Sequence, residues 1–188
     1  MTAMRIVLAS ASPRRGELLA AAGFAFDVRP VDIDERWRPG EPPDEYVTRL
    51  AGEKAARALV DWPDALALAA DTIVLVDGRI LGKPATDEEA GQMLRVLSGR
   101  MHDVLTGICV KSRARSASLV DRTTVRFMPL SEQEIAWYVA SGEPRDKAGA
   151  YAVQGLASRF VEEIRGSYTN VVGLPVAAVY RLLKSLGA

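Results

Sequence analysis

Apolar and polar positions follow two different periods along the chain. Residues 44–60 carry apolar side chains at helical spacing, so we expect a helix there. Residues 5–9, apolar after Arg5, and the apolar run 65–70 have the length typical of buried strands, and residues 103–111 and 117–127 predict two more strands. The pattern therefore predicts a chain in which helices and strands alternate.

Two further helices are marked by capping-box spacing, in which a hydroxyl residue precedes a glutamate by three positions. The pairs are Thr86 with Glu89 and Ser131 with Glu134. They predict helices that end near residue 97 and before Gly142, and a last helix is expected over residues 175–186. Residues 146–174 are expected to mix loops with short strands.

Asp77 and Gly78 form the two-residue turn of a predicted hairpin over residues 72–81. Because helices and strands alternate irregularly and hairpins are present, we predict an α/β (mixed α+β) fold with a mixed sheet. The length and the apolar content of 48% favour a single domain over residues 1–188.

Charge and composition exclude several classes of function. Lys plus Arg and Asp plus Glu both number 24, so the chain has no net charge that would draw it to nucleic acid. No run approaches the ~18 apolar residues of a membrane span. The lone cysteine, Cys109, agrees with a reducing cytoplasm, and His102, the only histidine, argues against a zinc site. We expect a cytoplasmic protein with no nucleic-acid or membrane partner.

The stretch "LASASPRRGELL" at residues 8–19 suits an anion. Ser12 and Pro13 are typical of a helix start, where backbone N–H groups are free, and the helix is expected to end at Gly23. Ser10 and the paired Arg14 and Arg15 add hydroxyl and guanidinium donors for phosphate oxygens. The alternative is a capped helix with solvated arginines.

Asp71 follows an apolar strand, at the edge where open α/β sheets place their ligand sites. A carboxylate there can activate water or hold a divalent cation, or it can merely cap the strand end through Thr72. Lys54 falls inside the apolar stripe of the helix predicted over residues 44–60, so it either extends to solvent or pairs with a buried acid.

Weaker candidates lie in loops. Lys83 in "GRILGKP" is not part of a P-loop, because the glycine spacing is too short and a proline replaces the required hydroxyl residue. Lys147 in the glycine-rich "DKAGAY" is a second possible phosphate partner. Asp32, Asp34 and Glu35 offer oxygen ligands for a hard cation, although such charge runs are usually solvated.

Taken together, these residues resemble the Maf family of nucleoside triphosphate pyrophosphatases. The matching stretches, in the family's order from residue 8 to residue 175, are "LASASPRRGELL", "AGEKA", "AADTIVLVDGRILGKP", "MLRVLSGRMHDVLTGI", "EPRDKAGAYAVQG" and "GSYTNVVGLP". The resemblance implies an elongated mixed sheet flanked by helices with a central cleft, and a homodimer. It also implies hydrolysis of a nucleotide's α–β phosphoanhydride with a divalent metal cation, Mg or Mn.

The resemblance also implies roles for individual residues. Asp71 takes the catalytic position, and Glu35 and Asp71 are the metal candidates. With Lys147 added, the substrate-binding candidates are Ser10, Arg14, Arg15, Lys54, Thr72, Lys83, Lys147 and Gln154. Gln154 in "YAVQG" is similar to the branch acting on dTTP and UTP, and a Gln amide can both donate to and accept from a pyrimidine imide edge.

Two alternatives stay open at this point. One is the same reaction on other or modified nucleotides. The other is a nucleotide-binding regulator of cell division with little turnover. The triad of Asp71, Lys54 and Lys83 favours an enzyme, since binding alone does not require a carboxylate close to a polyanion.

Overall fold

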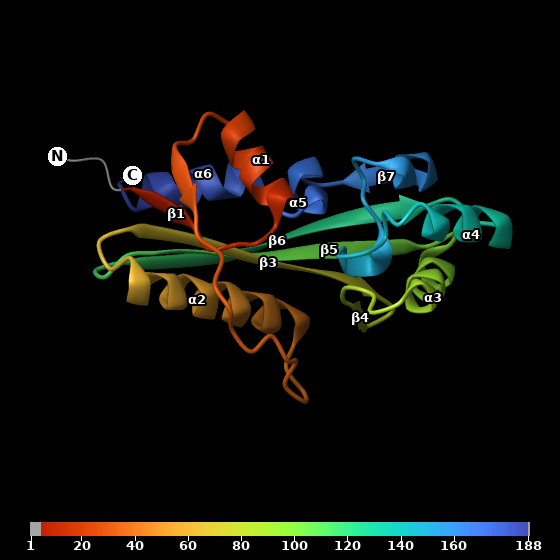
Figure 1. Ribbon diagram of the computed structural model, residues 1–188, viewed down its shortest axis with the longest axis horizontal. Coiled ribbons are helices and arrows are strands. Elements are labelled where there is room, and N and C mark those ends of the chain that lie inside the picture. Colours follow the sequence, from red (N-terminus) through yellow and green to blue (C-terminus); the bar gives the residue numbers. More distant parts are fainter. Residues whose placement is uncertain (1–4, 188) are drawn as a thin grey trace. The chain divides into compact units, whose positions relative to one another are not determined.

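The computed structural model of the protein describes residues 5–187 (Figure 1). Residues 1–4 and 188, which the predicted domain includes, lie outside the described residues. The strands are β1 (Ile6–Leu8), β2 (Phe26–Val28), β3 (Leu66–Val76), β4 (Arg79–Leu81), β5 (Met101–Lys111), β6 (Ser116–Phe127) and β7 (Val161–Arg165). The helices are α1 (Pro13–Ala21), α2 (Pro43–Asp61), α3 (Asp87–Leu97), α4 (Glu132–Ala140), α5 (Tyr168–Val172) and α6 (Val176–Ser185), with 3₁₀ helices η1 (Ala148–Ala150) and η2 (Leu156–Phe160).

The strands form one mixed sheet, as predicted. Their order is β2-β1-β3-β5-β6-β7, and β4 pairs with β3. β1 runs parallel to β2 and β3, whereas β4 and β7 run antiparallel to β3 and β6. The fold is therefore of the mixed α/β class, with helices flanking the sheet.

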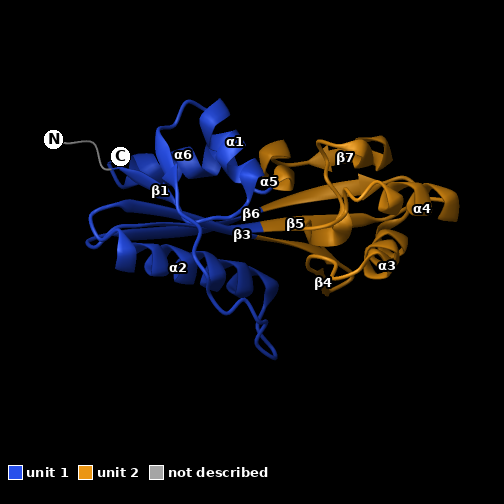
Figure 2. Cartoon of the chain, viewed as in Figure 1, with its two compact units in different colours: residues 1–71, 106–121, 173–188 blue, residues 72–105, 122–172 orange. Residues whose placement is uncertain are grey.

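The chain divides into two compact units (Figure 2). Unit 1 comprises residues 1–71, 106–121 and 173–188, and unit 2 comprises residues 72–105 and 122–172. Strands β3, β5 and β6 contribute residues to both units. The single domain expected from the sequence stays a prediction.

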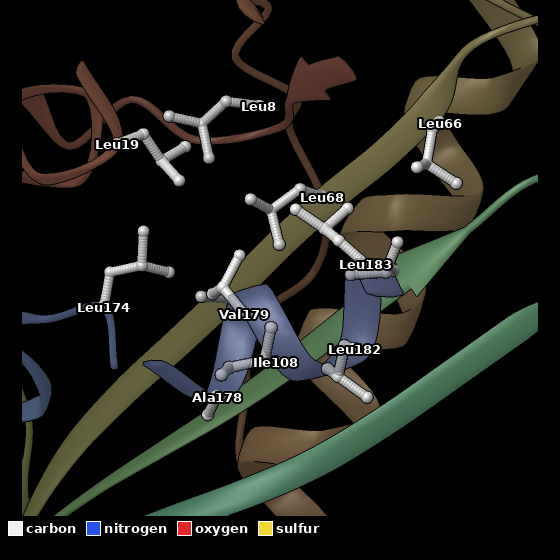
Figure 3. Packing of buried hydrophobic residues seen from close by; sticks show 12 residues of the cluster. Leu8, Leu19, Leu66, Leu68, Ile108, Leu174, Ala178, Val179, Leu182 and Leu183 are labelled. Atoms are coloured by element: carbon white, nitrogen blue, oxygen red, sulfur yellow. The ribbon is translucent and has the colours of Figure 1, made fainter. Parts of the chain in front are cut away.

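Unit 1 has a hydrophobic cluster on each face of its strands. On one face, Leu66 and Leu68 of β3 pack with Leu19 of α1 and with Val179 and Leu183 of α6 (Figure 3). These side chains are at least 97% buried. The large residues on this face separate the sheet from α1 and α6, which lie on the same side of it (Figure 1).

The other face of the unit 1 strands is built from small residues and is covered by α2. Ala67 and Ala69 of β3 alternate with the leucines of the first face, and they pack against Ala55 and Ala58 of α2. The helix lies so close to β5 that a Cβ atom on Gly107 would overlap the backbone of α2. Small side chains on both elements therefore set the position of α2.

Unit 2 contains a cluster of buried rings. His102 and Tyr151 lie edge-to-face around Phe127, with ring centroids 4.8–5.4 Å apart. His102 is 3% exposed, and its Nε2 lies 2.9 Å from the Tyr151 hydroxyl. His102 is therefore a buried residue of the unit 2 core.

Most predicted helix ends are confirmed, with one correction. Thr86 Oγ1 accepts a hydrogen bond from the Glu89 N–H, and α4 begins with a complete capping box. At α1, Ser12 occupies the N-cap position but its hydroxyl makes no capping bond. Instead, Ser10 Oγ accepts a hydrogen bond from the Ser12 N–H at 3.2 Å, because Ser10 is the buried hydroxyl of this turn.

Two other expectations are corrected. The strand expected over residues 65–70 continues through Asp71, so residues 66–76 form one long strand, β3. The carboxylate does not interrupt β3, because Lys54 neutralises it. The region 146–174 contains the short strand β7 but also η1, η2 and α5, where the sequence predicted loops and strands. Among residues 5–187, no helix is both long and apolar enough to cross a membrane.

Candidate active site

Asp71 and Lys54 form a buried ion pair. Asp71 lies on β3 directly after the buried Ala70, and Lys54 lies on the inner face of α2. The Lys54 Nζ is 2.7 Å from Asp71 Oδ1, and both residues are less than 10% exposed. Of the two outcomes left open for Lys54, pairing with a buried acid is confirmed.

Glu35 contacts the same ammonium from the loop between β2 and α2. Its Oε1 lies 2.7 Å from Lys54 Nζ, and its side chain is half exposed. The Tyr46 hydroxyl donates to the backbone carbonyl of Glu35 at 2.8 Å. Burial, together with the carboxylates of Asp71 and Glu35, raises the pKa of Tyr46 to about 12. Tyr46 therefore remains a hydrogen-bond donor at neutral pH and holds the loop in place.

Arg49 of α2 also fixes this loop, and sequence reasoning missed it. Its guanidinium is only 12% exposed and makes two hydrogen bonds with Glu41, at 2.6 and 2.8 Å. It also donates to the Arg36 carbonyl at 3.1 Å. The available signal was the helical spacing of Tyr46 and Arg49, three residues apart on one face of α2.

Arg15 is buried, and its guanidinium contacts acceptors within the protein. It donates to Ser10 Oγ at 3.1 Å, to the Ala70 carbonyl at 2.8 Å and to the Gly173 carbonyl at 2.9 Å. Burial lowers the pKa of Arg15, and the nearby Asp71 carboxylate opposes this change. Arg15 thus joins α1 to the segment of β3 that carries Asp71. Its contact with substrate stays a prediction.

Two of the expected site residues of unit 2, Lys83 and Lys147, lie on neighbouring loops. The Gly149 N–H donates to the Gly82 carbonyl at 3.0 Å, so the loops carrying Lys83 and Lys147 lie side by side. The Lys147 Nζ contacts Asp146 Oδ1 at 3.0 Å. Lys83 is exposed. Lys83 therefore offers exposed positive charge for an anionic ligand, whereas the ammonium of Lys147 is mostly buried and paired with Asp146.

The remaining candidates occupy simpler positions. Arg14 is partly buried on α1, where its charge helps to lower the pKa of Arg15. Thr72 follows Asp71 directly in β3 and is also partly buried. Gln154 is exposed on a turn closed by a 3.1 Å hydrogen bond from the Gly155 N–H to the Ala152 carbonyl. The roles of Arg14, Thr72 and Gln154 in substrate binding stay predictions.

The carboxylates of Glu35 and Asp71 suit a hard cation that takes few ligands from the protein. Within residues 5–187, no three His, Cys, Asp or Glu side chains are grouped as a metal site. Glu35 and Asp71 nevertheless present two carboxylates within 2.7 Å of one ammonium nitrogen. Magnesium is commonly held by one or two carboxylates together with substrate phosphates, so the residues present fit it.

The chain is similar to proteins of known structure and of curated function. The Staphylococcus aureus Ham1 protein is similar in fold, with a TM-score of 0.55 at 15% identity over 97% of this chain and 99% of that one. The dTTP/UTP pyrophosphatase of Anaeromyxobacter dehalogenans (strain 2CP-C) is 54% identical, covering 98% of this chain and 95% of the relative.

Two further relatives carry the same name. The dTTP/UTP pyrophosphatase of Syntrophus aciditrophicus is 50% identical over all of this chain and 93% of the relative, and that of Geobacter sulfurreducens is 52% identical over 98% and 97%. The family described as Maf-like protein matches residues 5–186. The chain therefore belongs to the Maf-like protein family.

Proposed function

We propose that this protein hydrolyses the α–β phosphoanhydride of dTTP and UTP, releasing the nucleoside monophosphate and pyrophosphate. The observation that carries the proposal is the cluster of Asp71, Lys54 and Glu35, in which one buried ammonium contacts two carboxylates at 2.7 Å. This cluster occurs in a chain that is 50–54% identical to several dTTP/UTP pyrophosphatases over nearly its whole length.

Asp71 is the proposed base. A carboxylate can accept a proton from the water that attacks the α-phosphorus, and its place on a central strand holds it firmly. Lys54 orients the carboxylate, and Arg15 fixes the preceding carbonyl of Ala70. Precise positioning of the base is worth a large part of the rate enhancement in reactions of this kind.

Positive charge assists the departure of pyrophosphate. Negative charge builds up on the leaving group during attack, so cations near it stabilise the transition state more than the ground state. We assign this role to Lys83, Lys147 and Arg14. A divalent cation, Mg or Mn, would be held by Glu35 and Asp71 and would neutralise phosphate oxygens when bound.

The proposal is tested by pyrophosphate release from a panel of canonical and modified nucleoside triphosphates, with magnesium or manganese. We expect the wild type to prefer dTTP and UTP. Asp71→Asn keeps the shape of the side chain but cannot accept the proton, so turnover should fall by roughly 10²- to 10⁴-fold while nucleotide still binds.

Other outcomes select the alternatives. A different preferred nucleotide would indicate the same reaction with another base specificity. Binding with no turnover of any nucleotide would contradict the proposal and favour a regulator of cell division. Wild-type turnover in Asp71→Asn would remove Asp71 from the catalytic position.

The proposal extends to assembly and location. We propose that the enzyme acts as a homodimer in the cytoplasm, since the family resemblance implies a dimer and a lone cysteine agrees with a reducing compartment. Light scattering of the purified chain gives its mass directly. A monomer at micromolar concentration would contradict this part of the proposal and leave the reaction unaffected.

A further inference from the structure

Glu143, three residues after the end of α4, accepts three hydrogen bonds that the proposed chemistry does not use. The Tyr138 hydroxyl donates to Oε1 at 2.9 Å, the Leu156 N–H donates to Oε2 at 2.9 Å, and the Ala157 N–H donates to Oε1 at 3.3 Å. The Tyr138 hydroxyl in turn accepts the Ala152 N–H at 3.1 Å. We call Glu143 and Tyr138 together the Glu143 clamp.

The Glu143 clamp holds both sides of the turn that carries Gln154. Ala152 is tied to the phenol before this residue, and Leu156 and Ala157 are tied to the carboxylate after it. All of these residues belong to unit 2. The backbone of the turn is therefore fixed from within one compact unit.

Gly155 is required for this contact. A Cβ atom at that position would overlap the carboxylate of Glu143, so the side chain of Glu143 fills the space that any other residue would occupy. The close approach brings the charge directly against the turn. The motif "YAVQG" thus contains Gln154, the side chain proposed to contact the base. It also contains Gly155, which leaves room for the Glu143 carboxylate.

Three hydrogen bonds of the Glu143 clamp are made to a carboxylate. Hydrogen bonds to an ionised acceptor are roughly twice as strong as neutral ones. Tyr138 is fully buried, and burial raises its pKa, so the phenol keeps its proton and continues to donate. Removing the carboxylate leaves three donors without this acceptor, and the residues after Gln154 then lose their hydrogen bonds to Glu143.

We propose that Glu143, with Tyr138, is a positioning residue that sets the place of the Gln154 amide and thereby the base selectivity of the enzyme. This inference rests on the proposed function. The backbone of the turn fixes the Cα–Cβ bond from which the exposed Gln154 side chain extends, so it limits the positions that the amide can reach. A displacement of about 1 Å is enough to cost ~10²-fold in a reaction that depends on geometry.

The test compares kcat/KM for UTP and for GTP in Glu143→Ala, Gln154→Ala and the double variant. We expect Glu143→Ala to lower the UTP/GTP ratio of kcat/KM by about tenfold, because the Gln154 amide is then no longer held in the position that favours UTP. In the Gln154→Ala background the same change should alter the ratio less than ~2-fold, because the side chain it positions is absent. Equal losses on both nucleotides, or additive changes in the ratio, would overturn the inference.

Three variants keep the test independent of folding. Glu143→Gln retains one acceptor oxygen, so its UTP/GTP ratio of kcat/KM should lie between those of Glu143→Ala and the wild type. Tyr138→Phe removes one hydroxyl and should lower the ratio slightly. Glu134→Ala is the matched control, since that carboxylate also accepts a backbone N–H, from Ser131 at 2.8 Å, at the far end of α4. It should lower stability and leave the ratio unchanged; a ratio shifted as far as by Glu143→Ala would overturn the inference.

Failure of the proposed function gives a different result. If the wild type hydrolyses no nucleotide, calorimetry measures the binding of UTP and GTP to the same variants. A wild-type preference for UTP that Glu143→Ala removes would support the inference without the reaction. A wild type that neither binds nor hydrolyses either nucleotide would overturn both.

Discussion

Lys54 has its charge inside the protein and contacts two carboxylates there. Removing one member of a buried ion pair is far more costly than removing both, because the remaining charge stays desolvated. Asp71 would be that remaining charge, since it is 9% exposed, whereas Glu35 can turn to solvent. The stability of this region therefore depends on the ammonium of Lys54.

We expect Lys54→Met to lower the free energy of unfolding by roughly 3 kcal/mol, measured by urea denaturation at pH 7. The double variant Lys54→Met/Asp71→Asn should recover much of this loss, because it removes the isolated charge. A Lys54→Met protein as stable as the wild type would show that Asp71 gains another partner or reaches solvent.

His102 gives the protein a defined pH dependence. Burial lowers the pKa of His102 from 6.5 to about 4, so the folded state binds the proton less readily than the unfolded chain. His102 therefore does not lower the free energy of unfolding above pH 6.5, where it is neutral in both states. As the pH falls from 6.5 to about 4, protonation of the unfolded chain lowers the free energy of unfolding by about 3 kcal/mol. Unfolding free energies at pH 4 and pH 7 measure it.

The control for this prediction is His102→Gln, which does not titrate but offers an amide to the Tyr151 hydroxyl, the partner of His102 Nε2. Both proteins have the same carboxylates, so the variant should lose less stability between pH 7 and pH 4 than the wild type does. Parallel stability curves for the two proteins would exclude His102 as the source.

Site residues could be predicted from the sequence where a polar or charged side chain lies in an otherwise apolar pattern. Lys54 stood out because it interrupts an apolar stripe, and the structure pairs it with Asp71. Arg14 and Arg15 were not separable, since adjacent arginines have the same chemistry. Only packing shows that Arg15 lies on the buried side of α1, four residues before the buried Leu19.

At the scale of elements, α2 packs unusually close to β5. A Cβ atom on Gly107 would overlap the backbone carbonyl of Val47. We expect Gly107→Ala to lower the free energy of unfolding by ~3 kcal/mol or more, because a helix backbone cannot yield as a flexible side chain can. Urea denaturation provides the measurement.

Gly91→Ala is the matched control for the close approach. It lies within α3, and its new Cβ would meet Arg95 Nη1 at 3.5 Å, an ordinary contact. Alanine in a helix interior is favoured over glycine by roughly 0.5–1 kcal/mol, so this variant should be more stable than the wild type. If both variants lowered the free energy of unfolding by a similar amount, the loss in Gly107→Ala could not be assigned to the close packing of α2 against β5.

Elements with long patterns were predictable, and those fixed by distant contacts were not. The helix expected over residues 44–60 is α2 (Pro43–Asp61) to within a residue at each end, because its stripe spans five turns. The unbroken β3 was missed, because its acid is neutralised by a lysine from another element. The short α5 was missed because five residues are too few to show a period.

At the scale of the whole molecule, the chain crosses between its two units repeatedly. Strands β3, β5 and β6 each supply residues to both units, so neither unit is a continuous segment of sequence. Each unit nevertheless has its own buried cluster, the leucine and alanine faces in unit 1 and the ring cluster in unit 2. Whether they unfold together depends on those shared strands.

We expect one cooperative unfolding transition, because breaking β3 or β5 in one unit removes the strand from the other. The chain has three tryptophans, and two of them report on different units: Trp62 packs against the core of unit 1, and Trp137 lies on α4 of unit 2. Trp37→Phe/Trp137→Phe isolates the first signal, and Trp37→Phe/Trp62→Phe isolates the second.

The two fluorescence curves in urea should share one midpoint and one slope, and both should agree with circular dichroism of the same variant. Agreement between all probes would support the single domain expected from the sequence. Separate midpoints would instead mean that the shared strands do not couple the units, because each half of a strand then unfolds with its own core. The wild type, whose fluorescence also includes Trp37, should show the same midpoint by circular dichroism as both variants, and this agreement checks that the substitutions themselves did not change the unfolding.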